Sequence, residues 1–274
     1  MFSHAKTPKL VAGDLMGTIV AIANQKGGVG KTSVTVNFGL PMAEIDKRCL
    51  FLDFDPQRNL TKVLAPELAS DEDFLTGNHK ASVINMFEST IKPIPYEIRS
   101  NVHIIGGNKK LTNINQDNIF NMADSLDLIK GDYDYIFIDC PPSSTLQHAA
   151  LAVADALLIV TELEKLSVDG VDELITTSRQ VKRRLNPTLE ILGIVPNFKE
   201  RIKINVQEEY QKKLHDNYGE LLFINHLYKT TKVKESIAVG KTLQEVVPKL
   251  SEKFGFDAAV FEFKERLANM RASS

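Results

Sequence analysis

The sequence predicts an α/β fold, a doubly wound and mostly parallel sheet with helices on both faces. Six short, almost continuous apolar runs alternate with segments of helical pattern. Such runs are typical of parallel strands covered on both faces, and right-handed crossovers between them give a doubly wound sheet. Three of the runs end in glycine or carboxylate motifs. Because ligands of these sheets bind beyond the carboxyl ends of the strands, the site is expected at that edge.

The expected elements follow one another without an internal repeat or a low-complexity segment. A helix is expected after the first strand, to about residue 46, and Pro41 should kink or shorten it. The polar stretch 65–80 is expected to be a surface loop or insertion. Strands are expected at residues 18–24, 48–55, 102–107, 133–140, 156–160 and 189–197, and 220–225 is a candidate for a seventh.

Composition places the chain among ordinary soluble proteins. Its 274 residues are 43% hydrophobic and 25% charged, with a net charge of −2. This charge excludes a global positive field, so any nucleic-acid binding needs a local basic patch. No apolar run reaches the roughly 18 residues of a membrane span, and the first residues lack the apolar region of a signal peptide. Cys49 and Cys140 lie in apolar runs and are expected to be buried thiols, so a cytoplasmic protein is expected.

The first motif is the segment QKGGVGKTS at residues 25–33, after the first strand. The standard phosphate loop, G-x-x-x-x-G-K-[ST], would need glycine where this chain has Gln25. Its glycines still let the backbone surround an anion, and the following helix adds its positive end. Lys31 is expected to reach the β- and γ-phosphates, and Thr32 to bind Mg²⁺. The expected nucleotide-binding residues of the loop are Lys26, Gly27, Gly28, Val29, Gly30, Lys31, Thr32 and Ser33.

The loop variant K-G-G-x-G-K-[ST] closely resembles the deviant phosphate loop of the ParA/MinD class of ATPases. The resemblance implies a P-loop NTPase domain over residues 18–274, after an N-terminal extension of residues 1–17. In that class the early lysine crosses the interface of a nucleotide-sandwich dimer and contacts the partner's phosphates. The resemblance therefore implies this role for Lys26, and a homodimer that forms on ATP binding.

The second motif, FLDFDPQRNLT, ends the second strand. Asp53 and Asp55 are two positions apart and would face the same side of an extended chain. Two carboxylates beside a triphosphate suit a switch in which one positions the attacking water and the other supports the metal shell. The segment resembles the ParA-type D-x-D-P-Q-G-N, which implies that Asp55 orients the water and leaves Asp53 for the metal. Arg58 replaces the glycine of that pattern, and it would either stiffen the switch or contact phosphate or the partner.

The third motif, YIFIDCPPS, is an apolar strand that ends in Asp139. Such a strand is the expected companion of a phosphate loop, with the carboxylate holding a Mg²⁺-bound water. The turn at Pro141 and Pro142 is similar to the D-x-P-P switch of the same class. Thr32, Asp53 and Asp139 are thus the expected metal residues.

The resemblance spans about residues 18–265 and favours a ParA-type partition ATPase. It implies slow Mg²⁺-dependent ATP hydrolysis with Lys26, Lys31 and Asp55 as catalytic residues. It also implies nonspecific DNA binding by the ATP-bound dimer, release by a centromere-binding ParB-like partner, and a cytoplasmic protein on the nucleoid when ATP-bound. The cargo is left open. Asn197 is expected to contact the base, and the expected DNA-binding residues are Arg201, Lys203, Lys229, Lys232 and Lys234.

Three other functions are open to a P-loop chain, and each requires features that the sequence can be checked for. A MinD-like membrane ATPase would need a detachable basic amphipathic tail, whereas the C-terminal stretch of mixed charge suggests a final helix packed on the sheet. An electron-transfer ATPase similar to nitrogenase reductase would need cluster-binding cysteines, and the chain has no C-x-x-C. A phosphate-loop ligase of small molecules is disfavoured by the early lysine and the D-x-D-P-Q segment.

Overall fold

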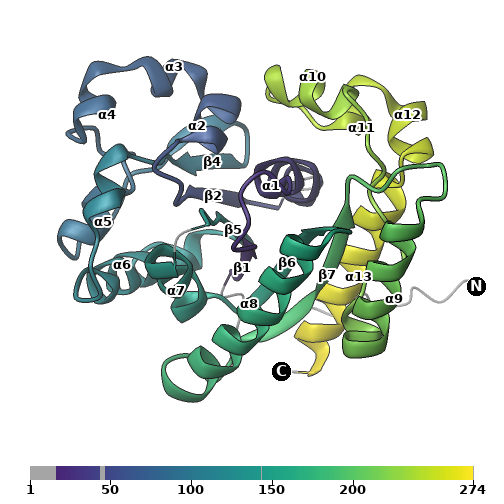
Figure 1. Ribbon diagram of the computed structural model, residues 1–274. Coiled ribbons are helices and arrows are strands. Elements are labelled where there is room, and N and C mark those ends of the chain that lie inside the picture. Colours follow the sequence, from purple (N-terminus) through teal and green to yellow (C-terminus); the bar gives the residue numbers. More distant parts are fainter. Residues whose placement is uncertain (1–16, 44–46, 143, 274) are drawn as a thin grey trace, which may run out of the picture.

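A seven-stranded sheet forms the centre of the computed structural model, which describes residues 17–43, 47–142 and 144–273 (Figure 1). The strand order is β3-β4-β2-β5-β1-β6-β7, and every pairing is parallel except the one between β3 and β4. The predicted doubly wound fold is therefore confirmed. The strands are β1 Thr18–Ala23, β2 Cys49–Asp53, β3 Tyr96–Arg99, β4 Val102–Ile105, β5 Tyr135–Asp139, β6 Ala156–Glu162 and β7 Glu190–Asn197.

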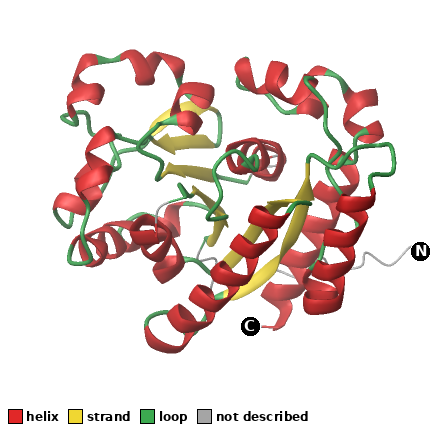
Figure 2. Ribbon diagram, in the orientation of Figure 1, coloured by secondary structure: helices red, strands yellow, loops and turns green. Residues whose placement is uncertain are grey.

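Helices cover both faces of this sheet (Figure 2). Alternate residues of β1 enter two separate cores, because successive side chains of a strand point to opposite faces. One core includes side chains of α6, α7 and α8, and the other those of α1 and α13. The helices are α1 Lys31–Gly39, α2 Asn59–Leu64, α3 Pro66–Ser70, α4 Glu72–Thr76, α5 Ile84–Glu88, α6 Asn118–Asp127, α7 Ser144–Val153, α8 Lys165–Arg184, α9 Asn205–Tyr218, α10 Lys232–Ala238, α11 Leu243–Val246, α12 Pro248–Lys253 and α13 Phe256–Ser273.

The pairing of the central strands brings the three motifs to one edge. β1 lies between β5 and β6, and β5 lies between β1 and β2. Ile22 of β1 is in register with Asp139 of β5, which in turn pairs with Asp53 of β2. Because all these strands run parallel, the glycine loop and the two carboxylate motifs all emerge at their carboxyl ends.

Several local predictions differ from the structure. The candidate strand at 220–225 is wrong, since Gly219–Leu221 is a 3₁₀ turn and Leu222 makes only an isolated bridge to Ile194. The stretch 65–80 is not a plain loop but holds the short helices α3 and α4. β3 was not predicted, because this edge strand has alternating exposure instead of a continuous apolar run.

Pro41 shortens the first helix as predicted. α1 ends at Gly39, and residues Leu40–Ala43 form a 3₁₀ turn. Gly39 itself packs so closely on β2 that an added β-carbon would lie 2.6 Å from the Phe51 ring. The predicted end of this helix near residue 46, like most of the N-terminal extension, lies outside the described residues.

The final helix packs on the sheet as predicted. α13 buries Phe256, Ala259, Phe263 and Leu267 in the core that it shares with α1. Most of the apolar face that a membrane-binding tail would need is therefore covered, whereas Phe261 is 66% exposed. Among the described helices, none has both the length and the apolar character required to cross a bilayer.

Candidate nucleotide-binding site

The glycine loop between β1 and α1 has a backbone that requires glycine. Gly28 and Gly30 have φ angles of 84° and 93°, in the left-handed region that other residues rarely adopt. At Gly30 an added β-carbon would also lie 2.2 Å from Nδ2 of Asn197. Val29 is fully buried and anchors the loop between these two glycines. α1 then begins at Lys31, so its first unpaired N–H groups are available to an anion held by the loop.

A cavity of about 650 Å³ opens at this edge of the sheet. It joins the glycine loop to the two segments that follow β2 and β5, and it includes two residues from after β7. A polyphosphate and a nucleoside would fit such a volume. The lining residues are Gly27, Gly28, Gly30, Lys31, Thr32, Ser33, Asp55, Pro56, Gln57, Asn59, Thr112, Pro141, Pro142, Phe198 and Lys234.

The two loop lysines point to different partners. Lys31 lines the cavity, is 8% exposed, and donates from Nζ to the main-chain carbonyl of Lys26 at 2.8 Å. Burial lowers the pKa of Lys31, which anionic phosphates would counteract. Lys26 instead pairs its ammonium with the carboxylate of Glu164, immediately before α8. Lys31 is thus placed for a nucleotide in the same subunit, and Lys26 is held at the outer side of the loop.

Thr32 and Asp139 provide a pair of oxygen ligands beside the loop. The Thr32 hydroxyl donates to Oδ2 of Asp139 at 2.6 Å. Burial raises the pKa of Asp139 to about 8, and the neighbouring Asp53 carboxylate adds to the shift. A hydroxyl and a buried carboxyl whose pKa stays raised although Lys31 lies near it fit Mg²⁺, which binds few protein ligands and takes the rest from phosphates and water. Accordingly, the described residues contain no larger cluster of His, Cys, Asp and Glu that could hold a metal alone.

Asp53 does not line the cavity. It is fully buried, and its carboxylate accepts hydrogen bonds from the amide and hydroxyl of Thr61 at 2.8 and 2.6 Å. It also accepts one from the amide of Asp55 at 3.1 Å. Burial raises the pKa of Asp53 to about 6. These bonds tie the segment after β2 to the strand and so support a positioning role, while the metal role of Asp53 stays a prediction. Asp139 is buried to a similar degree, but its carboxylate contacts Thr32, which lines the cavity.

Asp55 reaches the cavity two residues further on. Its Oδ1 accepts a hydrogen bond from the amide of Gln57 at 2.8 Å, which holds the carboxylate at the cavity wall. Asp53 and Asp55 were predicted to face the same ligand, but only Asp55 lines the cavity. One carboxylate is buried and shapes the segment, and the other faces the cavity.

Asn197 connects β7 to the glycine loop. It is 3% exposed, its Nδ2 donates to the carbonyl of Val29 at 2.8 Å, and its Oδ1 accepts from the amide of Phe198 at 2.9 Å. Both ends of the side-chain amide are therefore used inside the protein, and Asn197 does not line the cavity. Phe198, the next residue, does line it. Phe198 was not predicted, because a single aromatic residue after a strand is a weak signal in a sequence.

The comparisons with known proteins agree with this geometry. A family model described as an AAA domain, AAA_31, matches residues 17–191. The sporulation initiation inhibitor protein Soj of Bacillus subtilis is 36% identical over 209 residues, which are 73% of this chain and 81% of Soj. The chromosome partitioning protein ParA of Myxococcus xanthus is 31% identical over 237 residues, which are 83% of this chain and 81% of that protein. The chain belongs to the ParA family of P-loop partition ATPases.

Solved structures show the same fold. An ATP complex of Cyanothece McdA superimposes with a TM-score of 0.78 at 22% sequence identity. The match covers 92% of this chain and 97% of the McdA chain. At this identity the similarity concerns the architecture, and the roles of individual residues rest on the geometry above.

The backbone conformation at Arg58 explains why ParA-type switch segments carry glycine at this position. Its φ and ψ of 59° and 37° are left-handed, which is the conformation that glycine adopts without strain. The amide of Arg58 donates to the carbonyl of Asp55 at 2.8 Å and closes the turn before α2. Its Nε is buried without a hydrogen-bond partner among the described residues.

The five residues predicted to bind DNA in the ParA manner do not form one equivalent set. Arg201 and Lys203 are exposed, and the Arg201 guanidinium lies 5.6 Å from the centre of the Phe254 ring. Lys229 pairs with Glu200 at 2.8 Å, and Lys232 pairs with Glu235 at 2.6 Å. Lys234 lines the nucleotide cavity.

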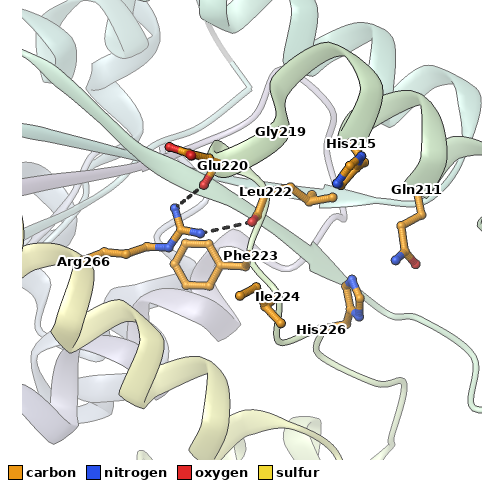
Figure 3. Close-up of a pocket in the computed structure, with 9 residues that line it drawn as sticks. All are labelled: Gln211, His215, Gly219, Glu220, Leu222, Phe223, Ile224, His226 and Arg266. Atoms are coloured by element: carbon orange, nitrogen blue, oxygen red, sulfur yellow. Dashed lines mark hydrogen bonds between the residues drawn. The ribbon is translucent and has the colours of Figure 1, made fainter.

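A second cavity, of about 540 Å³, lies between α9, the segment 219–226 and α13 (Figure 3). Arg266 points into it from α13 and donates to the carbonyls of Glu220 and Leu222 at 2.9 and 3.1 Å. Burial lowers the pKa of His226, on the opposite wall, to about 4, which keeps that ring neutral. The Arg266 guanidinium here is occupied by main-chain carbonyls, so the first cavity is the better candidate for phosphate binding.

Proposed function

We propose that this chain is a DNA partition ATPase whose ATP-bound form is a nucleotide-sandwich dimer that binds DNA without sequence preference. The observation that carries the proposal is the composition of one cavity. The start of α1, Lys31, Thr32 and the cavity-facing carboxylate of Asp55 meet there, and Lys26 of the same loop is paired with Glu164. The names of the relatives, Soj and ParA, support the choice of partition among P-loop functions.

Hydrolysis would proceed by in-line attack of water on the γ-phosphate, with catalysis by positioning and electrostatics. Asp55 would orient the water, because its carboxylate is fixed at the cavity wall by the amide of Gln57. Lys31 would leave the carbonyl of Lys26 and pair with the β- and γ-phosphates. Asp53 would keep the switch segment in place through Thr61.

Mg²⁺ would be held by Thr32 and, through water, by Asp139. When bound, it would neutralise charge that develops on the phosphate oxygens. The 2.6 Å contact between these two side chains supports this assignment, since a metal bound there would offset the burial that raises the pKa of Asp139. Slow basal turnover is expected, and a ParB-like partner would stimulate ATP hydrolysis.

DNA binding would use the exposed basic residues around Arg201, Lys203, Lys229 and Lys232. The ion pairs of Lys229 and Lys232 lie on the surface, where such pairs contribute little and phosphates can replace the carboxylates. The net charge of −2 means that binding depends on this local face. In the cell the ATP-bound dimer would then associate with the nucleoid.

The proposal is tested by retention of random-sequence DNA with ATP and with ADP. Retention should require ATP and weaken steeply as salt rises. Asp55→Ala should bind ATP and retain DNA longer, because it cannot hydrolyse the nucleotide. Arg201→Ala should lose retention, whereas Lys249→Ala, at an exposed position of α12, should not. Retention that is equal with ATP and ADP would contradict the proposal, and ATP-dependent flotation with liposomes would favour the MinD-like alternative.

A further inference from the structure

Lys234 differs from its basic neighbours in where it lies. It belongs to the first turns of α10 and lines the same cavity as Lys31, Thr32 and Ser33. Lys229 and Lys232 each have a carboxylate partner, Glu200 and Glu235. In the part of the chain that the structure describes, no ion pair is found for Lys234. Its ammonium is therefore an unneutralised cation at the wall of the nucleotide cavity.

The backbone fixes Lys234 next to the glycine loop. The segment before α10 is hydrogen bonded to the end of β7, through Lys199 to the carbonyl of Leu227 at 3.1 Å and Lys229 to the carbonyl of Lys199 at 2.9 Å. The end of β7 is in turn fixed to the loop by Asn197 and Val29. The backbone that precedes Lys234 is thus connected to the glycine loop through ordered contacts, and the exposed side chain of Lys234 extends from there.

The strand order separates the part of the cavity lined by Phe198 and Lys234 from the part lined by Asp55. Asp55 and Pro141 follow β2 and β5, on one side of β1, whereas Phe198 follows β7, on the other side. Because Asp55 marks the end where the γ-phosphate would react, Phe198 and the start of α10 mark the nucleoside end. The ring of Phe198 approaches Gly30, with its tip 3.3 Å from the position of an added β-carbon.

We propose that Lys234 is a nucleotide-binding residue that contacts the phosphate nearest the ribose, beside the aromatic wall of Phe198. The inference rests on the proposed ATPase function, because it places the nucleotide in this cavity. An ammonium on a four-carbon stem can reach an anionic oxygen without a fixed geometry, and such charge-assisted contacts are stronger than neutral ones. The contact is independent of the γ-phosphate, so it should serve ATP and ADP equally.

Calorimetric titration of ATP and ADP into the full chain tests the proposal. Lys234→Ala should weaken both nucleotides by the same factor, about fivefold to tenfold for one partly exposed charge-assisted contact. Lys234→Arg should keep most of the affinity, because the charge is retained. Lys241→Ala, an exposed lysine just beyond α10, should bind like the unchanged chain.

The possible outcomes separate this inference from the proposed function. If Lys31→Ala loses nucleotide while Lys234→Ala binds both nucleotides normally, the inference fails and the proposed function stands. Normal nucleotide affinity combined with lost DNA retention in Lys234→Ala would assign the residue to the DNA-binding face instead. If the unchanged chain binds neither nucleotide, both proposals fail.

Discussion

At the scale of single residues, Arg58 combines two unfavourable features in the switch segment. Its backbone is in the left-handed region, which costs an L-residue about 1–2 kcal/mol. Its Nε is also buried without a partner in the described part of the protein. Sparsely populated conformations often occur in switch regions, where the surrounding structure imposes them. Here the surrounding structure is the turn closed by Asp55 and Arg58 itself.

Arg58→Gly should therefore stabilise the nucleotide-free protein, by about 0.5–1 kcal/mol after allowance for the greater entropy of glycine in the unfolded chain. Urea denaturation measures the change. Arg58→Ala is the matched control, because it removes the guanidinium but keeps the β-carbon that causes the backbone strain. Equal stability of the two variants would show that the strain is in the side chain and not in the backbone.

At the scale of elements, one arginine fastens the last helix to the segment that precedes α10. Arg266 of α13 donates to the carbonyls of Leu192, Glu220 and Leu222, and it pairs with Glu262 one turn earlier. Its guanidinium also lies 4.4 Å from the centre of the Phe223 ring. Because the segment 219–226 has no strand ladder, these side-chain bonds satisfy carbonyls that a sheet would otherwise pair.

Arg266→Met should lower the free energy of unfolding by about 2–3 kcal/mol, because it leaves carbonyls and the Glu262 carboxylate without their charged partner. Chemical denaturation with fluorescence or circular dichroism as the signal provides the measurement. Lys253→Met, at an exposed position just before α13, should change stability by less than about 0.5 kcal/mol. Similar losses in both variants would mean that Arg266 contributes by its charge alone.

At the scale of the whole molecule, the ion pair between Lys26 and Glu164 links the glycine loop to the start of α8 within one subunit. A lysine that crosses a dimer interface must first leave this carboxylate. Both side chains are partly exposed, with 29% and 45% of their surface accessible, so the pair is weak enough to exchange for phosphate. Dimerisation would then depend on the nucleotide that supplies the competing charge.

Lys26→Ala should keep ATP affinity within about twofold and lose ATP-dependent dimerisation, because Lys31 and the loop amides remain. The comparison is best made in an Asp55→Ala background, where ATP persists, by size-exclusion chromatography with light scattering. Lys249→Ala in the same background should dimerise. Normal dimerisation of the Lys26→Ala protein would contradict the proposed contact of Lys26 across the dimer interface.

Much of the fold and of the loop could be predicted from the sequence, because both depend on local patterns. Apolar runs identify buried parallel strands, and Gly30, Lys31 and Thr32 are adjacent in the chain. Asp55 and Asp139 could be placed at this edge of the sheet for the same reason, since Asp139 ends β5 and Asp55 lies two residues after β2. The edge strand β3 was not predicted, because its exposure alternates. The segment 220–225 was wrongly predicted as a strand, because its pairing depends on Ile194, which is distant in the sequence.

The sequence by itself determined the family, the parallel sheet and the chemistry of the glycine loop, since these follow from strand periodicity and from residues a few positions apart. Only the tertiary structure decided which way each side chain is used. Asp53 and Asn197 belong to motifs, yet their polar atoms are buried and bonded to Thr61 and Val29. Lys234 lies among basic residues in the sequence but lines the nucleotide cavity. The reason is physical: burial and hydrogen bonding depend on strand order and packing, and these bring together residues as far apart in the sequence as Val29 and Asn197, 168 positions.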